Sequence, residues 1–163
     1  VLPAYLIGGG QESGRRSGTE NTFGIMQFVY AAEKKFATIR EDFSRLKAYR
    51  EMLWEGLNKS IFTRLSSEEG TPYILSVSAA GLRGEVLLHM ADDKGLIIGT
   101  GSACSSNAKN RHVSSALVAF GLSESDADCT VRMSLCKDNT REDIDKFAEL
   151  LASGIQRLVK IKR

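Results

Sequence analysis

The sequence predicts an α+β fold, in which helices cover a sheet of three or four strands. Two observations lead to this prediction. Apolar residues recur every three or four positions in several long segments, as on the buried face of an amphipathic helix. Between these segments lie short stretches in which apolar and polar residues alternate, as in half-buried strands. The chain has 163 residues, which is about the length of one domain and enough to bury a core without disulfides.

The first third of the chain is predicted to be a glycine-rich loop followed by two helices. Residues 8–21 hold five glycines and two arginines. Residues 22–36 show a helical pattern, with Phe28 and Phe36 on its apolar face. A second, longer helix is predicted from Ile39 to near Asn58, because leucines recur there at helical spacing and Arg, Glu and Lys fill the opposite face.

The rest of the chain is predicted to mix strands and helices. The predicted strands are residues 61–65, 73–78, 96–99 and 130–135. The predicted helices are residues 84–93, residues 113–120, which Gly121 ends, and a long helix that Thr140 caps. A loop over residues 100–111 contains Cys104.

The composition excludes several classes of protein. Hydrophobic residues make up 42% of the chain and charged residues 26%, as in ordinary globular proteins and unlike disordered or collagenous ones. No apolar run approaches the ~18 residues that a membrane-spanning helix needs. The net charge of +2 is too near neutrality to indicate nucleic acid or an anionic membrane as a partner.

The cysteines and the first residues indicate a reducing compartment. The three cysteines, Cys104, Cys129 and Cys136, are too few and odd in number for a secreted disulfide framework. None has the spacing of zinc ligands, so no metal site is predicted, and Cys129 and Cys136 are expected to be small buried residues. The first residues lack a signal-peptide pattern, and a chain that opens at Val1 and soon reaches a glycine run is expected to come from a longer polypeptide. We therefore expect a cytoplasmic protein.

The glycine-rich segment GGGQESGRRSGTEN, residues 8–21, is the first candidate site. Glycine-rich turns that lead into a helix can bind a phosphate through successive backbone N–H groups. Arg15 and Arg16 add positive charge, and Ser17 and Thr19 can donate hydroxyl hydrogen bonds. The alternative is a surface loop whose glycines only supply positive φ angles.

The segment GTGSACSSN, residues 99–107, is the second candidate site. Small polar neighbours leave Cys104 approachable, and the basic residues Lys109 and Arg111 follow it while acidic residues are absent nearby. This local charge favours the nucleophilic thiolate. The alternative is an exposed thiol without a function.

The strand segment VRMSLC, residues 131–136, is the third. Arg132 is predicted on one strand face, and Val131, Met133 and Leu135 on the other. An arginine that projects from a sheet into a cleft can bind a carboxylate with two parallel hydrogen bonds. The alternative is an arginine paired with a nearby acid on the solvent face.

Together, these three segments resemble the cysteine desulfurases of the NifS/IscS-like group, in the class V aminotransferase family of fold-type I pyridoxal phosphate enzymes. GGGQESGRRSGTEN resembles the family motif that follows the cofactor lysine, GSACSS its catalytic cysteine loop, and VRMSL with NTREDID its last strand and helix. The resemblance implies that residues 1–37 are the C-terminal remnant of the large cofactor-binding domain. It implies that residues 38–163 are the small C-terminal domain, which carries the cysteine loop.

The resemblance also implies the chemistry and the site residues. In this family, pyridoxal 5'-phosphate is the cofactor, a loop thiolate attacks the sulfur of L-cysteine, L-alanine leaves, and the enzyme keeps a persulfide. Cys104 matches the nucleophile and Arg132 the arginine that holds the substrate carboxylate. Thr19 matches the threonine that reaches the cofactor phosphate of the neighbouring subunit, which implies a homodimer with shared active sites. A protein acceptor for the sulfur is implied, for iron–sulfur cluster assembly, tRNA thiolation or another route.

One departure from the family limits this expectation. The Schiff-base lysine lies upstream in the family, and none of the ten lysines of this chain stands in its motif. We therefore expect the full-length protein to be a cysteine desulfurase and the fragment alone to be inactive. The alternatives are a selenocysteine lyase, which shares fold and cofactor, and a non-catalytic module that accepts persulfide sulfur or binds a partner.

Overall fold

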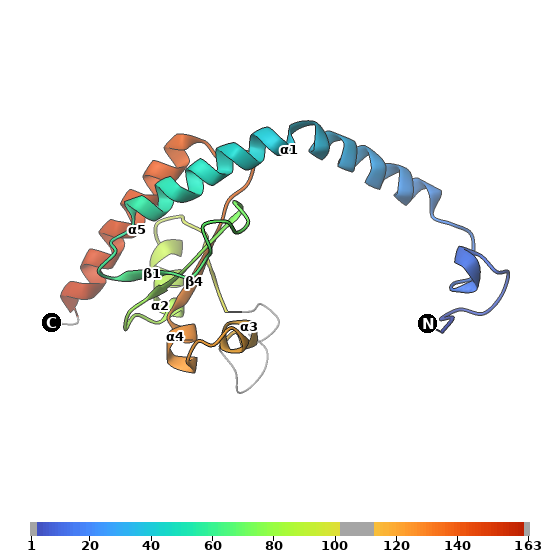
Figure 1. Cartoon of the computed structure of the whole chain (residues 1–163). Helices are drawn as coiled ribbons and strands as arrows, with labels where there is room; N and C mark the ends of the chain where they lie inside the picture. Colours follow the sequence, from blue (N-terminus) through green and yellow to red (C-terminus); the bar gives the residue numbers. More distant parts are fainter. Residues whose placement is uncertain (1–2, 102–112, 162–163) are drawn as a thin grey trace. The chain divides into compact units, whose positions relative to one another are not determined.

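The computed structural model describes residues 3–101 and 113–161 and divides the chain into two compact units, Val1–Arg40 and Glu41–Arg163 (Figure 1). The boundary between the units lies close to the predicted boundary after residue 37. That residues 1–37 belong to a larger cofactor-binding domain stays a prediction.

The first unit is a loop followed by the first half of a helix. The loop contains a short 3₁₀ turn, η1 (Glu12–Gly14), and a single bridge between Leu6 and Arg16. The glycines at which the loop turns, Gly10, Gly14 and Gly18, have positive φ angles, which glycine adopts at little cost. None of the described residues 3–40 is buried.

Helix α1 (Thr22–Gly56) is continuous, so the prediction of two helices, with a break between residues 36 and 39, is wrong. Residues 25–55 contain no glycine or proline, so nothing in the chain ends a helix there. What changes along α1 is the burial of its residues, because none of residues 22–40 is buried. In the second unit the buried residues Asp42, Leu46, Arg50 and Leu53 follow at spacings of three and four.

The second unit contains a four-stranded antiparallel sheet in the order β1-β2-β4-β3. Its strands are β1 (Phe62–Arg64), β2 (Ile74–Ala79), β3 (Gly99–Thr100) and β4 (Thr130–Ser134). The strands predicted for the β1, β2 and β4 regions are confirmed. The strand predicted at residues 96–99 is misplaced. The backbone N–H of Leu96 donates to Ala91 at 2.9 Å, which closes a helix end, so only the two residues of β3 pair with β4.

Four further helices complete this unit: α2 (Gly84–Asp92), α3 (Ser115–Ala119), α4 (Glu124–Asp128) and α5 (Arg141–Ile161). Three of them were predicted, and α4 was missed. Ser123 caps α4, because its Oγ accepts a hydrogen bond from the backbone N–H of Asp126 at 3.1 Å. Gly121, after α3, has a φ of 96°, as a helix-ending glycine requires.

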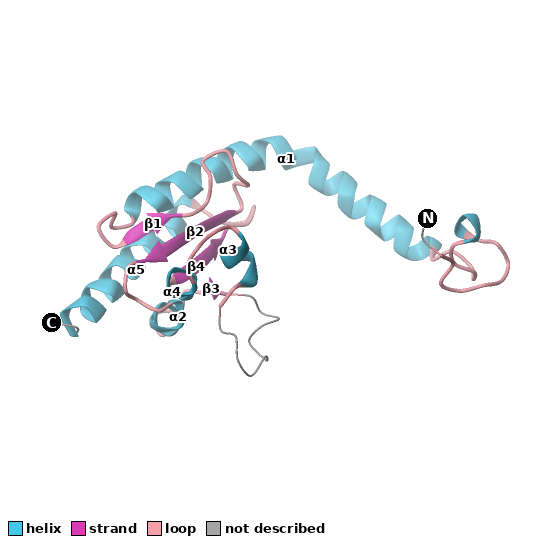
Figure 2. Cartoon of the chain, turned by 60° about the horizontal axis from the view of Figure 1, so that its bottom comes forward, coloured by secondary structure: helices cyan, strands magenta, loops and turns pink. Residues whose placement is uncertain are grey.

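The core lies between one face of the sheet and the long helices (Figure 2). Inward residues of β2 and β4 alternate with outward ones, and Leu75, Val77 and Val131 are at most 1% exposed. Leucines of α1, α2 and α5 pack with them in one cluster. The opposite face carries polar residues, including Ser76, Arg132 and Ser134. The predicted α+β fold, with helices covering a small sheet, is confirmed.

Candidate functional site

Arg132 projects from the polar face of the sheet, opposite the core. Its register partners are Ser76 on β2 and Gly99 on β3. The guanidinium lies over β3: a Cβ placed on Gly99 would stand 3.3 Å from Nη2 of Arg132. Among residues 3–101 and 113–161, no acid forms an ion pair with Arg132. The alternative prediction, that Arg132 pairs with a nearby acid on the solvent face, therefore finds no such acid in the described part of the chain.

Cys104 lies outside the described residues, as do Lys109 and Arg111, so its role stays a prediction. The structure does describe the strand that leads to this segment. Gly99 and Thr100 pair with Arg132 and Val131 on β4. The chain therefore passes beside Arg132 a few residues before it reaches Cys104.

Thr19 lies exposed in the loop of the first unit. Nη1 of Arg16 donates to the carbonyl oxygens of Gly18 and Thr19, at 3.0 and 3.2 Å. The side chain of Arg16 therefore holds the shape of the loop, while the Thr19 hydroxyl has no hydrogen-bond partner among the described residues. The positive φ angles support a conformational role for three of the glycines, and phosphate binding stays a prediction. Thr19 and Arg132 belong to different units.

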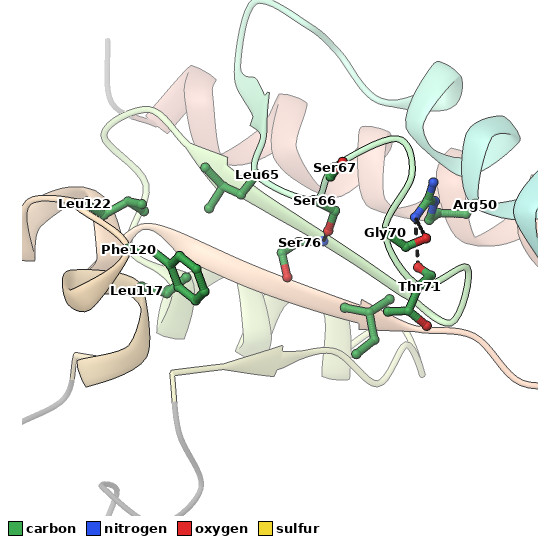
Figure 3. Close-up of a pocket in the computed structure, with 11 residues that line it drawn as sticks. Arg50, Leu65, Ser66, Ser67, Gly70, Thr71, Ser76, Leu117, Phe120 and Leu122 are labelled. Carbon is green, nitrogen blue, oxygen red and sulfur yellow. Dashed lines mark hydrogen bonds between the residues drawn. The ribbon is translucent and has the colours of Figure 1, made fainter.

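A pocket of about 600 Å³ opens beside the polar face of the sheet (Figure 3). Ser76, the neighbour of Arg132, contributes to its wall together with Ile74. The remaining wall comes from α1, from the segment between β1 and β2 and from the region of α3. In chain order these residues are Arg50, then Leu65, Ser66, Ser67, Gly70 and Thr71, then Leu117, Phe120 and Leu122. The lining is mostly apolar with a few hydroxyl groups, as is typical of small-molecule sites.

Arg50 fixes one wall of this pocket and is not among the residues predicted from the sequence. Its side chain is fully buried, and it donates to the carbonyl oxygens of Glu68, Gly70 and Thr71 at 2.5, 3.1 and 2.8 Å. It also donates to the carboxylate of Glu51. A signal was present in the sequence, since Arg50 stands at a core position of α1, between Leu46 and Leu53.

Glu51 links Arg50 to Arg64. Nη1 and Nη2 of Arg64 donate to the two Glu51 oxygens at 2.6 and 2.8 Å, a bidentate pair. The hydrogen bonds from Arg64 hold the pKa of Glu51 below its ordinary value, and burial opposes this effect in part. This network supports the pocket wall and does not reach Arg132.

Two negative findings concern the described residues alone. In residues 3–101 and 113–161, no three His, Cys, Asp or Glu side chains gather as metal ligands would. Within the same ranges, the helices are too short or too polar to cross a membrane.

Cys136, expected to be buried, is exposed, and Cys129 is half-buried. Cys136 falls after the end of β4, where its backbone N–H donates to Asn139 Oδ1 in a turn, so its side chain has no place in the core.

Comparison with known proteins matches most of the chain to one family. The family described as "Aminotransferase class-V" matches residues 6–147. "Cysteine desulfurase IscS 1" of Archaeoglobus fulgidus is 35% identical over 159 residues, which cover 96% of this chain and 41% of that protein. "Cysteine desulfurase IscS" of Pectobacterium carotovorum is 36% identical over 161 residues, or 96% of this chain and 38% of that protein.

The fold comparison agrees. A solved "NIFS-LIKE PROTEIN" matches with a TM-score of 0.76 and 30% identity, over 95% of this chain and 39% of the solved chain. The NifS-like protein of Rickettsia africae matches with a TM-score of 0.75 and 25% identity, over 96% of this chain and 41% of the other. The chain thus spans about two-fifths of the length of the relatives that it matches.

Proposed function

This chain belongs to the class V aminotransferase family, and from that premise we propose that it is the C-terminal part of a cysteine desulfurase. The observation that carries the proposal is Arg132, which stands without an acid partner in the described residues, beside the strand that leads to Cys104. Curated relatives at 35% and 36% identity bear the name cysteine desulfurase, which supports it. A cytoplasmic homodimer that delivers sulfur to an acceptor protein belongs to the same proposal.

Arg132 binds the α-carboxylate of L-cysteine in this proposal. Its planar guanidinium can donate two parallel hydrogen bonds to a carboxylate, which a lysine cannot do. The polar face around it carries the hydroxyl groups of Ser76 and Ser134, and no acid among the described residues forms an ion pair with Arg132. Substrate specificity for an amino acid would therefore begin at this side chain.

Cys104 takes the sulfur. Its thiolate attacks the substrate Sγ, an S–S bond forms, and the Cβ–Sγ bond of the substrate breaks. The electron pair of the broken bond stays on carbon, which gains a proton, so that L-alanine leaves and Cys104 holds a persulfide. Thiol and L-cysteine become persulfide and L-alanine, so the step needs no external oxidant.

The residues present fit one part of a pyridoxal phosphate site. Thr19 has an exposed hydroxyl with no partner in the described residues, and its carbonyl oxygen accepts a hydrogen bond from Arg16. The hydroxyl can therefore donate to the phosphate of a cofactor bound in the neighbouring subunit. The cofactor supplies the electron sink for cleavage of the Cβ–Sγ bond. In the family the anchoring lysine lies upstream of the segment that Thr19 belongs to, and none of the ten lysines of this chain stands in its motif, so we expect no turnover by the 163 residues alone.

The test is to express the chain with the upstream polypeptide of the full-length protein and measure sulfide and alanine formed from L-cysteine. We expect turnover by the parent protein and its loss in Cys104→Ala, with Cys129→Ala as the matched control that retains it. Full activity of Cys104→Ala would show that Cys104 is not the nucleophile.

The same experiment separates the alternatives. A strict selenocysteine lyase would act on selenocysteine and leave L-cysteine unchanged. A non-catalytic module would release no alanine from either substrate in the extended protein. If the 163-residue chain, mixed with pyridoxal phosphate, developed the visible absorption of a lysine-bound cofactor, the expected inactivity of the fragment would be wrong.

A further inference from the structure

Gly99 is a glycine whose backbone does not require glycine. It lies in β3, and its φ is not among the positive φ angles of the described chain. Glycine in a strand costs conformational entropy and offers no side chain to pack. Where it occurs without a positive φ, it often marks a place where another group approaches the backbone closely.

The group that approaches Gly99 is the guanidinium of Arg132. A Cβ on Gly99 would stand 3.3 Å from Nη2 and 3.7 Å from both Cζ and Nε of Arg132. Three guanidinium atoms therefore lie within 4 Å of the point where a side chain at position 99 would begin. The absence of a side chain at position 99 therefore opens the space that the guanidinium occupies.

The arginine is held there by little else. Arg132 is exposed, and no described residue forms a hydrogen bond or an ion pair with its side chain. On its other side stands Ser76 of β2. The pose of the guanidinium in the described structure thus depends on the shape of the strand beneath it.

We propose that Gly99 is a positioning residue, which sets the pose in which Arg132 receives the carboxylate of the substrate. The proposal rests on the carboxylate-binding role proposed above for Arg132. A methyl group at position 99 would lie too close to Nη2, and the exposed arginine side chain would move away rather than the strand. Two parallel hydrogen bonds depend on the orientation of the guanidinium plane, so this displacement weakens carboxylate binding.

Binding and stability should then change in opposite directions. Replacing glycine by alanine at an ordinary φ usually stabilises a protein, because the unfolded chain loses freedom. A Gly99→Ala variant is therefore expected to unfold at the same temperature as the parent chain or above it. A glycine kept only for packing would instead show a lower unfolding temperature.

The test uses the 163-residue chain and acetate as the carboxylate probe. The Nε–Hε resonance of Arg132 is assigned by its loss in Arg132→Ala and is followed by NMR as acetate is added. We expect Gly99→Ala to bind acetate about five- to tenfold more weakly, as for a charge-assisted hydrogen bond that is partly lost. Thr100→Ser, on the same strand but the opposite face, is the control and should bind as the parent does.

Equal acetate affinity in Gly99→Ala and parent would overturn the proposal, and so would a fall in unfolding temperature that accompanies the weaker binding. In the extended protein, KM for L-cysteine should rise with less change in kcat. If that protein released no alanine while Arg132 still bound acetate in a Gly99-dependent way, the proposed reaction would fail and the positioning role would stand. If the Arg132 resonance of the parent chain did not shift as acetate was added, the proposed carboxylate binding by Arg132 would be wrong, and this proposal would be wrong with it.

Discussion

Arg50 is a charged side chain at a position where the pattern of α1 would select leucine. It is fully buried, and its donors serve three backbone carbonyl oxygens and Glu51. A buried charge is tolerated only where such partners surround it. The pattern of the sequence could show that position 50 is inward, but not that the carbonyls of a segment 18 to 21 residues later would meet it there.

We expect Arg50→Ala to lower the free energy of unfolding by about 3 kcal/mol or more, because it leaves buried acceptors without donors and opens a cavity. Urea denaturation measures this change. Lys47→Ala is the matched control on the same helix, and since Lys47 is exposed it should cost no more than about 0.5 kcal/mol. Equal effects of the two substitutions would contradict the role of Arg50.

Glu51 gives a prediction that depends on pH. Its pKa in the folded chain is lowered from 4.5, chiefly by the hydrogen bonds from Arg64. A carboxyl with a lowered folded pKa stabilises the fold above its unfolded pKa and loses this contribution as the pH falls through the folded value. The urea midpoint of the parent chain should therefore exceed that of Glu51→Gln most at pH 6–7. The difference should shrink as the pH falls well below 4.5, and a difference that stayed constant would show that the ion pair does not contribute.

At the scale of the elements, the start of α5 carries a helix-capping pattern that is visible in the sequence. Oγ1 of Thr140 accepts a hydrogen bond from the backbone N–H of Asp143 at 3.2 Å, and the Asp143 carboxylate accepts one from the N–H of Thr140 at 2.9 Å. This is a reciprocal capping box, with Asp in place of the usual Glu or Gln. The predicted cap is confirmed.

Thr140→Ala should lower the free energy of unfolding by about 1 kcal/mol, because one N–H of the first turn loses its acceptor. Ser153→Ala, in the middle of the same helix, is the control, since that hydroxyl only bonds to the carbonyl of Leu150 and caps nothing. Thermal unfolding compares the two. An unchanged transition in Thr140→Ala would mean that the cap does not stabilise α5 in the intact chain.

Three elements differ from the predictions made from the sequence, each for its own physical reason. The sequence pattern predicts two helices where α1 is one, although Phe36, Ile39 and Phe43 follow at spacings of three and four and so continue one helix face. Helix α4 is only five residues long and buries one of them, Ala127, so it has no periodicity to detect. Its sole signal is the Ser123-x-x-Asp126 spacing. Strand β3 was misplaced because apolar character alone does not tell which backbone groups a neighbouring turn has already used.

At the scale of the molecule, the site could be predicted only in part. The sequence indicated Arg132 on a strand, away from the apolar face, and the structure agrees. Its neighbours Ser76 and Gly99 come from distant parts of the chain, and only the strand order brings them together. The order of the strands in the sheet cannot be derived from the sequence pattern of any single strand. The roles of Cys104 and Thr19 come from the resemblance to the family and stay predictions.

The distribution of buried residues predicts that the second unit folds by itself. None of the described residues 3–40 is buried, whereas the hydrophobic core begins at Leu46. A chain of residues 41–163 should therefore unfold in one transition, within about 1 kcal/mol of the parent. A chain that begins at residue 48 lacks Leu46 and should lose at least about 2–3 kcal/mol. Loss of the transition in the 41–163 chain would show that the first unit is needed for folding.

The pairing of β2 with β4 has a consequence for the order of events during synthesis. Leu75 and Val77 need Met133 and Val131 beside them, yet about fifty residues separate the two strands. At translation rates of about 5–20 residues per second, β2 waits on the order of several seconds for its partner. During that interval its apolar side chains are accessible to other nascent chains, so the time near the ribosome is when this protein most needs protection by a chaperone.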